Sequence, residues 1–147
     1  MSDLIQLRIG ERPWLPTPTT ESIEIFDRYD MPTSGLVRQG RKLFVFDCVE
    51  GHAMVGNVWI YAEVSEAEAR LLQEAEGDDF VRLFESAFAG KDVMAVLAID
   101  ARVRSGSQVN SSTIARKGLM KAVFERLREG VEIAGETAKA MEQLVTC

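Results

Sequence analysis

Two neighbouring segments of the sequence, residues 43–49 and 58–64, carry apolar side chains on both of the faces that an extended strand presents. The first segment places Phe44, Phe46 and Cys48 on one face, and Leu43, Val45, Asp47 and Val49 on the other. A strand that faces water on one side alternates apolar and polar residues, whereas a strand that is covered on both sides does not. Both segments are therefore predicted to lie in the middle of a sheet, and the Gly-containing turns beside them favour an antiparallel meander.

Further strand patterns flank this central pair. Residues 22–26 predict a one-sided strand, with Ile23 and Ile25 on one side and Glu24 on the other. Residues 36–38 predict a brief strand after a turn that contains proline and glycine. Residues 92–104 carry an apolar residue at every second position, while the opposite face begins apolar and turns polar from Asp100, and this pattern predicts one long strand.

The first twenty residues are predicted to form an extended N-terminal arm, because three prolines between positions 13 and 18 exclude a central strand or a helix there. Residues 4–9 within the arm alternate and indicate a short edge strand. Trp14 and Leu15 are expected to pack back onto the same domain; docking on a second subunit is the alternative.

Two short helices are predicted after the central strands. Ser65 and Glu68 have the spacing of a capping box, in which each side chain bonds the backbone N–H of the other residue. Gly77 is expected to end this first helix, and Asp78 or Asp79 is expected to cap the second. The second helix has an apolar stripe at helical spacing, formed by Phe80, Leu83, Phe84, Ala87 and Phe88.

A long amphipathic helix is predicted from about residue 112 to residue 144, with a break at Gly130 or Gly135 as the alternative. Its apolar stripe consists of Met120, Phe124, Leu127, Val131, Ala134, Ala138, Met141 and Val145. The sequence thus predicts a single α+β domain over residues 1–147. We expect a mainly antiparallel sheet of about four or five strands, two short helices and a long C-terminal helix.

Composition limits the classes of protein that remain. No stretch approaches the roughly 18 consecutive apolar residues of a membrane-spanning helix, and the first residues lack the layout of a signal peptide. Two cysteines do not make a disulfide framework, and the net charge of −6 argues against a nucleic-acid-binding protein. We therefore expect a cytoplasmic protein that binds neither membranes nor nucleic acid.

No catalytic, metal or cofactor site is predicted from motifs. Cys48 and His52 could pair as nucleophile and base, with Asp47 or Glu50 as the orienting group. Cys48, however, shares its strand face with two phenylalanines and is expected to point into the core. A metal site is not expected, since the sequence has one histidine. Phosphate-loop, dinucleotide-binding and nucleophile-elbow motifs are absent from the sequence.

The positive functional signal is an uneven distribution of charge. Residues 63–92 contain nine acidic and three basic side chains, whereas residues 101–130 contain seven basic and two acidic ones. A polar, basic corner begins where the strand predicted over residues 92–104 ends, and the helix that follows would offer free backbone N–H groups to an anion. The predicted anion- or partner-binding residues are Asp100, Arg102, Arg104, Ser105, Ser107, Asn110, Arg116 and Lys117. The alternative is ordinary capping with solvated arginines.

The C-terminal stripe supports a second hypothesis, because a helix of 33 residues would be about 50 Å long and would extend beyond a domain of this size. Its apolar end could pair with a second copy and form a two-fold dimer. The residues expected at that interface are Leu127, Val131, Ala134, Ala138 and Met141. The alternative is a helix that covers the protein's own sheet.

The sequence Tyr29-Asp30-Met31-Pro32, followed by Gly40, Phe44-Val45-Phe46 and then Trp59-Ile60-Tyr61-Ala62 with Ser65, resembles a group of small uncharacterised bacterial and phage-borne proteins. That group has a YD-x-P turn, a G-x-x-x-F strand and a W-x-Y strand before a helix. The resemblance covers about a quarter of the sequence and implies a bacterial accessory domain. It implies no catalytic residue.

From the residues alone, we expect a non-catalytic cytoplasmic module that binds an acidic ligand or a partner protein. The partner could be a second copy of the chain, which would form a homodimer. The alternative is a small enzyme whose cleft lies near Asp100, Arg102 and Arg104 and which uses carboxylate acid–base chemistry. A buried Asp100 beside an arginine would favour the enzyme.

Overall fold

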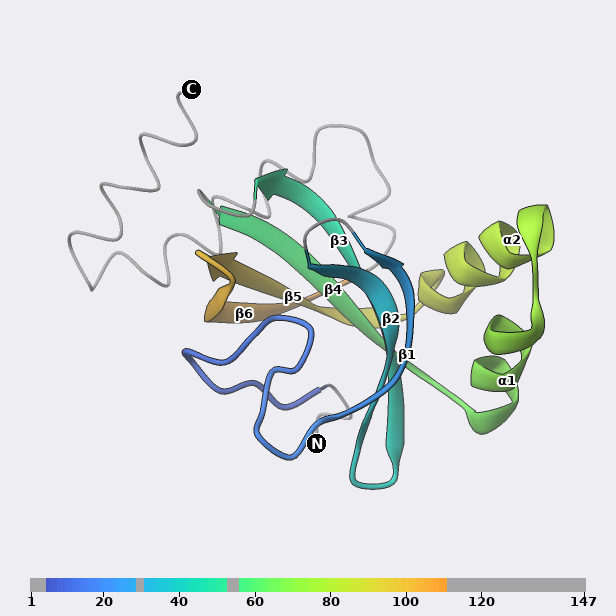
Figure 1. Cartoon of the computed structure of the whole chain (residues 1–147), viewed down its shortest axis with the longest axis horizontal. Helices are drawn as coiled ribbons and strands as arrows, with labels where there is room; N and C mark the ends of the chain where they lie inside the picture. The colour runs from blue at the N-terminus through green and yellow to red at the C-terminus, as the bar shows by residue number, and fades with distance from the viewer. Residues whose placement is uncertain (1–4, 29–30, 53–55, 111–147) are drawn as a thin grey trace.

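The computed structural model describes residues 5–28, 31–52 and 56–110, which form one antiparallel sheet and two helices (Figure 1). The elements in chain order are β1 (Glu21–Arg28), β2 (Pro32–Gln39), β3 (Lys42–His52), β4 (Gly56–Val64), α1 (Glu66–Glu74), α2 (Gly77–Phe88), β5 (Asp92–Ile99) and β6 (Arg102–Asn110). The six strands of this sheet lie in the order β1-β2-β3-β4-β5-β6, so each strand pairs with its neighbours in sequence. The α+β class and the antiparallel meander are thereby confirmed.

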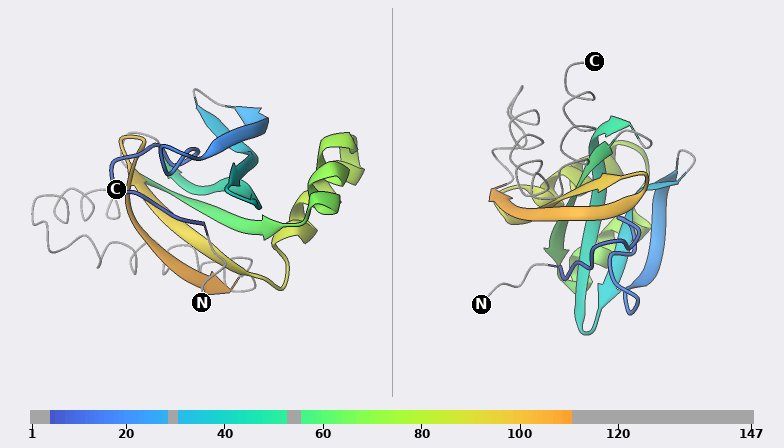
Figure 2. Two further views of the ribbon diagram at one scale, coloured as in Figure 1. Left: turned by 90° about the horizontal axis from the view of Figure 1, so that it is seen from below. Right: turned by 90° about the vertical axis from the view of Figure 1, so that its left-hand side faces the viewer.

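The central strands β3 and β4 are covered on both faces, as their sequence predicts. One face carries a cluster that includes Val45, Val58 and Ile60, and α1 and α2 pack against it through residues such as Leu72 and Phe88. The opposite face is aromatic, and apolar side chains of the arm, such as Ile5 and Trp14, pack against it. Its fully buried side chains include Phe44, Phe46, Trp59 and Tyr61. Figure 2 shows that the sheet is strongly curved and that the arm runs between its two halves.

The prediction of one long strand over residues 92–104 is wrong, because the chain reverses in a two-residue turn. Asp100 and Ala101 both have positive φ angles, 55° and 57°, and Ile99 pairs directly with Arg102. Apolar residues continue at every second position through this turn, and the turn contains no glycine, so the alternation gives no sign of it. The serine, glycine and asparagine residues between positions 105 and 110 predict a loop, but this segment belongs to strand β6. The described sheet therefore has six strands rather than four or five.

The edge strand expected near the N-terminus does not form in residues 5–9. The backbone N–H of Arg8 donates to the carbonyl of Pro16 at 2.8 Å, and that of Gly10 donates to the carbonyl of Val103 at 2.9 Å. The arm thus bonds partly to itself and partly to β6. Trp14 and Leu15 pack against the aromatic face of their own domain, in agreement with the sequence.

The capping box at the start of α1 is confirmed by two hydrogen bonds of 3.0 Å between Ser65 and Glu68. The boundary between the helices differs from the prediction, since α1 ends at Glu74 and α2 begins at Gly77 with Glu76 in the N-cap position. Asp78 and Asp79 lie in the first turn of α2 and do not cap it. The predicted apolar stripe of α2 packs on the sheet, as its spacing indicates.

The predicted C-terminal helix lies outside the described residues, and so does the dimer stripe formed by Leu127, Val131, Ala134, Ala138 and Met141. Among the helices of the described part, none is long and apolar enough to cross a membrane.

Candidate functional site

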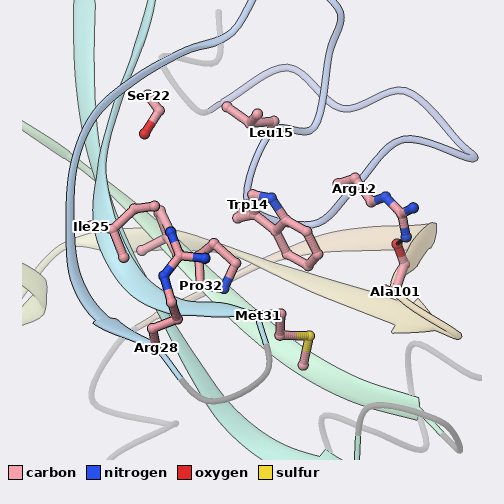
Figure 3. A pocket seen from close by; sticks show the side chains of 10 residues that line it. Arg12, Trp14, Leu15, Ser22, Ile25, Arg28, Met31, Pro32 and Ala101 are labelled. Carbon is pink, nitrogen blue, oxygen red and sulfur yellow. Dashed lines mark hydrogen bonds between the residues drawn. The ribbon is translucent and has the colours of Figure 1, made fainter.

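A cleft of about 560 Å³ opens on the aromatic side of the sheet, between the arm, β1 and the turn that joins β5 to β6 (Figure 3). This volume is within the range of small-molecule sites, roughly 300–1,000 Å³. The cleft is lined by Arg12, Trp14, Leu15, Ser22, Ile25, Arg28, Met31, Pro32, Phe46 and Ala101.

Backbone hydrogen bonds hold the arm against β6 and so form one side of the cleft. The N–H of Val103 donates to the carbonyl of Glu11 at 2.7 Å, and the carbonyl of Val103 accepts from the N–H of Gly10 at 2.9 Å. Arg102 donates from Nη1 to the carbonyl of Gly10 at 3.1 Å, and Arg12 donates from Nη1 to the carbonyl of Ala101 at 3.4 Å. The arm and the β5–β6 turn are therefore joined by bonds in both directions.

A buried phenol fixes the middle of the arm. The hydroxyl of Tyr61 donates to the carbonyl of Pro13, and burial raises the pKa of Tyr61 well above its ordinary value. The phenol therefore keeps its proton and remains a hydrogen-bond donor at physiological pH. This bond positions Trp14, the next residue along the chain.

The interior of the cleft is apolar and aromatic. Trp14 is half-buried, and its ring lies 5.9 Å from that of Trp59 at an interplanar angle of 48°. Phe46 is buried beneath the cleft and contacts the same Trp59, with ring centroids 5.9 Å apart. Met31 and Ile25 contribute half-buried aliphatic surface. A flat or aliphatic group would be desolvated on this surface.

Two exposed arginines flank this apolar interior. Figure 3 shows Arg12 and Arg28 on opposite sides of the cleft, with Trp14 between them. The guanidinium carbon of Arg12 lies 5.9 Å from the centroid of the Trp14 ring, within range of a cation–π contact. Neither arginine forms an ion pair with a described residue, and no acidic side chain is among the described residues that line the cleft. The electrostatic potential there favours an anion.

The structure brings only part of the predicted basic corner to this cleft. Asp100 is exposed in the β5–β6 turn, Ala101 lines the cleft, and Arg102 bonds the arm. A bulge at Arg104 shifts the register of β6. The three residues therefore do not share the single strand face that the sequence predicts.

The other predicted anion-binding residues lie elsewhere on β6 or beyond it. Ser105 and Ser107 pair with Leu97 and Ala95, whose side chains belong to the cluster on the helix side of the sheet. Asn110 is at the far end of β6, about 27 Å along the strand from Arg102. Arg116 and Lys117 lie outside the described residues.

The sequence interpretation missed the arginines of the cleft, which come from segments far from the predicted corner. Arg12 is in the arm and Arg28 is the last residue of β1. The one signal in the sequence was Trp14, an aromatic residue in a proline-rich arm. Trp14 lines a cleft because the arm contacts the β5–β6 turn, and this contact joins residues 89 positions apart in the sequence.

Cys48 and His52 do not form a catalytic pair in this fold. Cys48 packs with the aromatic cluster, as its position in the strand predicts. His52 lies on the same strand, and its backbone pairs with Gly56. Four residues along a strand separate two backbone positions by about 13 Å. Within residues 5–28, 31–52 and 56–110, no group of three metal-ligating side chains was found.

Asp47 is a half-buried carboxyl group on the helix side of the sheet, away from the cleft. Burial, reinforced by the nearby charge of Asp27, raises its pKa from 3.8 to about 6, although a hydrogen bond from the Cys48 backbone acts in the opposite direction. Its cross-strand neighbours are Ser34 and Ile60. Asp47 therefore affects the pH dependence of stability rather than ligand binding in the cleft.

Fold and site together define a small antiparallel α+β domain with an arm-bounded, arginine-flanked cleft. No protein-family model matches the chain, and neither a curated protein nor a solved structure matches it. The resemblance to small bacterial and phage-borne proteins therefore rests on the sequence motifs alone. Of those motif residues, Met31 and Pro32 line the cleft, whereas Trp59 and Tyr61 support it from below.

Proposed function

We propose that this protein is a non-catalytic cytoplasmic binding module whose cleft takes an anion attached to an apolar group. The observation that carries the proposal is the pair of arginines, Arg12 and Arg28, free of ion pairs with described residues, on either side of an aromatic interior. Such an anion could belong to a free small molecule or to an acidic segment of a partner protein, since both present a carboxylate or phosphate beside apolar atoms.

The chemistry of arginine supports an oxyanion as the charged part of the ligand. A guanidinium presents its donors in a planar fork that matches a carboxylate or phosphate, and it remains charged at every physiological pH. Trp14 offers a ring face to the apolar part, with Met31 and Ile25 beside it. Each charge-assisted hydrogen bond contributes about 1.5–3 kcal/mol.

The position of Asp100 supports a binding role over the alternative of an enzyme. Acid–base catalysis at the predicted corner would require a carboxyl group that is buried beside Arg102 or Arg104. Asp100 is instead exposed in a turn, and Arg102 bonds a backbone carbonyl of the arm. The dimer formed through the C-terminal stripe stays a prediction.

The test is calorimetric titration with 2-naphthoate, with the neutral analogue 2-naphthylmethanol, and with a capped peptide in which one tryptophan is flanked by glutamates. We expect naphthoate or the peptide to bind, and the alcohol to bind at least about tenfold more weakly. Tight binding of naphthoate alone would indicate a small-molecule site, and tight binding of the peptide alone would indicate a partner protein.

The matched variants are Arg12→Gln with Arg28→Gln, against Arg41→Gln as a control at an exposed arginine in the β2–β3 turn. The double variant should lose about tenfold to a hundredfold in affinity for the anionic probe, while the control should not change it. Equal affinities for the wild type and the double variant, or equal binding of naphthoate and its alcohol, would refute the proposal.

A further inference from the structure

The two helices form a second concave surface, which the proposed cleft does not involve. A groove of about 560 Å³ lies between α1 and α2, lined by Leu71, Glu74, Ala75, Asp79, Arg82, Leu83 and Ser86. Leu71 is apolar and yet 51% exposed. Figure 1 places α1 and α2 together at one side of the molecule, and Figure 2 shows the β5–β6 turn at the opposite end. The groove and the cleft are therefore separate sites.

The helix pair is strongly acidic. Residues 66–88 contain seven acidic and two basic side chains, a net charge of −5. Three of the acids already have cations: Glu66 pairs with Arg38 at 3.3 Å, Glu68 pairs with Lys91 at 3.1 Å, and Asp79 pairs with Arg82. No described cation pairs with the other four, which are Glu74, Glu76, Asp78 and Glu85.

The end of α1 adds negative potential to the groove. Its last turn holds Glu74 and no basic residue, and this turn supplies Leu71, Glu74 and Ala75 to the groove. An acid at a helix C-terminus is unfavourable by about 0.3–1 kcal/mol, because it lies beside the negative end of the helix dipole. Asp78 and Asp79 offset the positive N-terminal end of α2. The dipole of α1 is therefore not offset at its C-terminal end, and Glu74 adds to the negative potential of the groove.

We infer that the α1–α2 groove docks a basic segment of a partner protein, with one apolar side chain of that segment against Leu71, Ala75 and Leu83. Lysines or arginines beside the anchor would face Glu74 and the two unpaired acids that follow it in the sequence, Glu76 and Asp78. The apolar side chains among the lining residues suit a single apolar anchor, and the charge of the helix pair selects for a basic flank and against an acidic one.

The inference is tested on the full chain with an amphipathic peptide built only from lysine and leucine at helical spacing. The control peptide has glutamate in place of every lysine. Fluorescence anisotropy should show saturable binding of the basic peptide, weakened at higher salt, and at least about tenfold weaker binding of the acidic one.

Two variants of equal charge change locate the binding. Leu71→Ser with Glu74→Lys alters the groove, and Glu74→Lys also removes an acid from a helix C-terminus, so α1 should remain folded. Glu85→Lys changes the charge of α2 by the same amount at an exposed position outside the groove. The groove variant should lose about tenfold in affinity or more, and Glu85→Lys less than about threefold.

Equal losses in the two variants would show general electrostatic attraction and overturn the inference. Self-association of the wild type that disappears in the Leu71→Ser/Glu74→Lys variant would also overturn it, since the occupant would then be a second copy of this chain. Circular dichroism on each variant confirms that it is folded. Loss of peptide binding with naphthoate binding retained would separate this groove from the cleft.

Discussion

Asp47 should make the folded protein less stable at neutral pH than at mildly acidic pH. Its pKa is about 6 in the folded state and 3.8 in the unfolded reference, so between these values the folded state binds more protons than the unfolded one. By linkage, the free energy of unfolding then falls as the pH rises from about 4 to 6 and stays lowered above that range. Below pH 4 both states hold the proton, and the carboxyl group has no unfavourable effect.

The size of the effect follows from the two pKa values. Their difference corresponds to about 3 kcal/mol, and solvent screening of this half-buried group reduces the expected effect to about 1–2 kcal/mol. Asp47→Asn keeps the shape of the side chain and removes its charge. The variant should therefore be more stable than the wild type by about 1–2 kcal/mol at pH 7.5, and by much less at pH 4.

The assay is urea-induced unfolding, followed by circular dichroism, at intervals from pH 4 to 8. Glu21→Gln, at an exposed position of β1, is the matched control and should follow the wild-type curve. Asp27→Asn should give a smaller gain than Asp47→Asn, because the charge of Asp27 is the second cause of the raised pKa and burial is the first. An Asp47→Asn curve parallel to that of the wild type over the whole range would refute the reasoning.

Two further predictions concern packing. Gly35→Ala should lower the free energy of unfolding by about 2–3 kcal/mol in urea titration. The added Cβ would lie 2.5 Å from the carbonyl oxygen of Glu24 and 3.0 Å from the Phe46 ring. A change below about 0.5 kcal/mol, as at an ordinary surface site, would contradict this prediction. Tyr61→Phe should cost about 1–2 kcal/mol by leaving the carbonyl of Pro13 without its donor, and should weaken naphthoate binding at the cleft. Unchanged stability and unchanged binding would show that this bond does not hold the arm.

The parts of the fold that could be predicted are those set by local pattern. Two-sided burial of β3 and β4 followed from apolar residues at successive positions, and the start of α1 followed from Ser65 and Glu68. The β5–β6 turn could not be predicted, because alternation continues through Asp100 and Ala101 and neither residue is a glycine. The dihedral angles of this turn are set by the pairing of the strands on either side, which no short window of sequence contains.

Local sequence pattern predicts even less of the candidate site than of the fold. The uneven distribution of charge predicts a basic region near Arg102, and Arg102 does adjoin the cleft. The arginines that flank the cleft, Arg12 and Arg28, become neighbours only when the arm crosses the aromatic face of the curved sheet. Their relation depends on tertiary contacts with β6, so the sequence could indicate a basic region but not the arginines that flank the cleft.

The bonds that tie the arm to β6 have a consequence for the order of events during synthesis. Gly10 leaves the ribosome early, but Arg102 and Val103, which hold it, are 92 and more residues behind. At about 5–20 residues per second, these partners follow some 5–20 s later. From the synthesis of Trp59 until that of Arg102, the nascent chain presents Trp59 and its aromatic neighbours while the bonds from β6 to the arm are still missing. This waiting time, rather than the meander of adjacent strands, is the vulnerable period for aggregation and for chaperone capture.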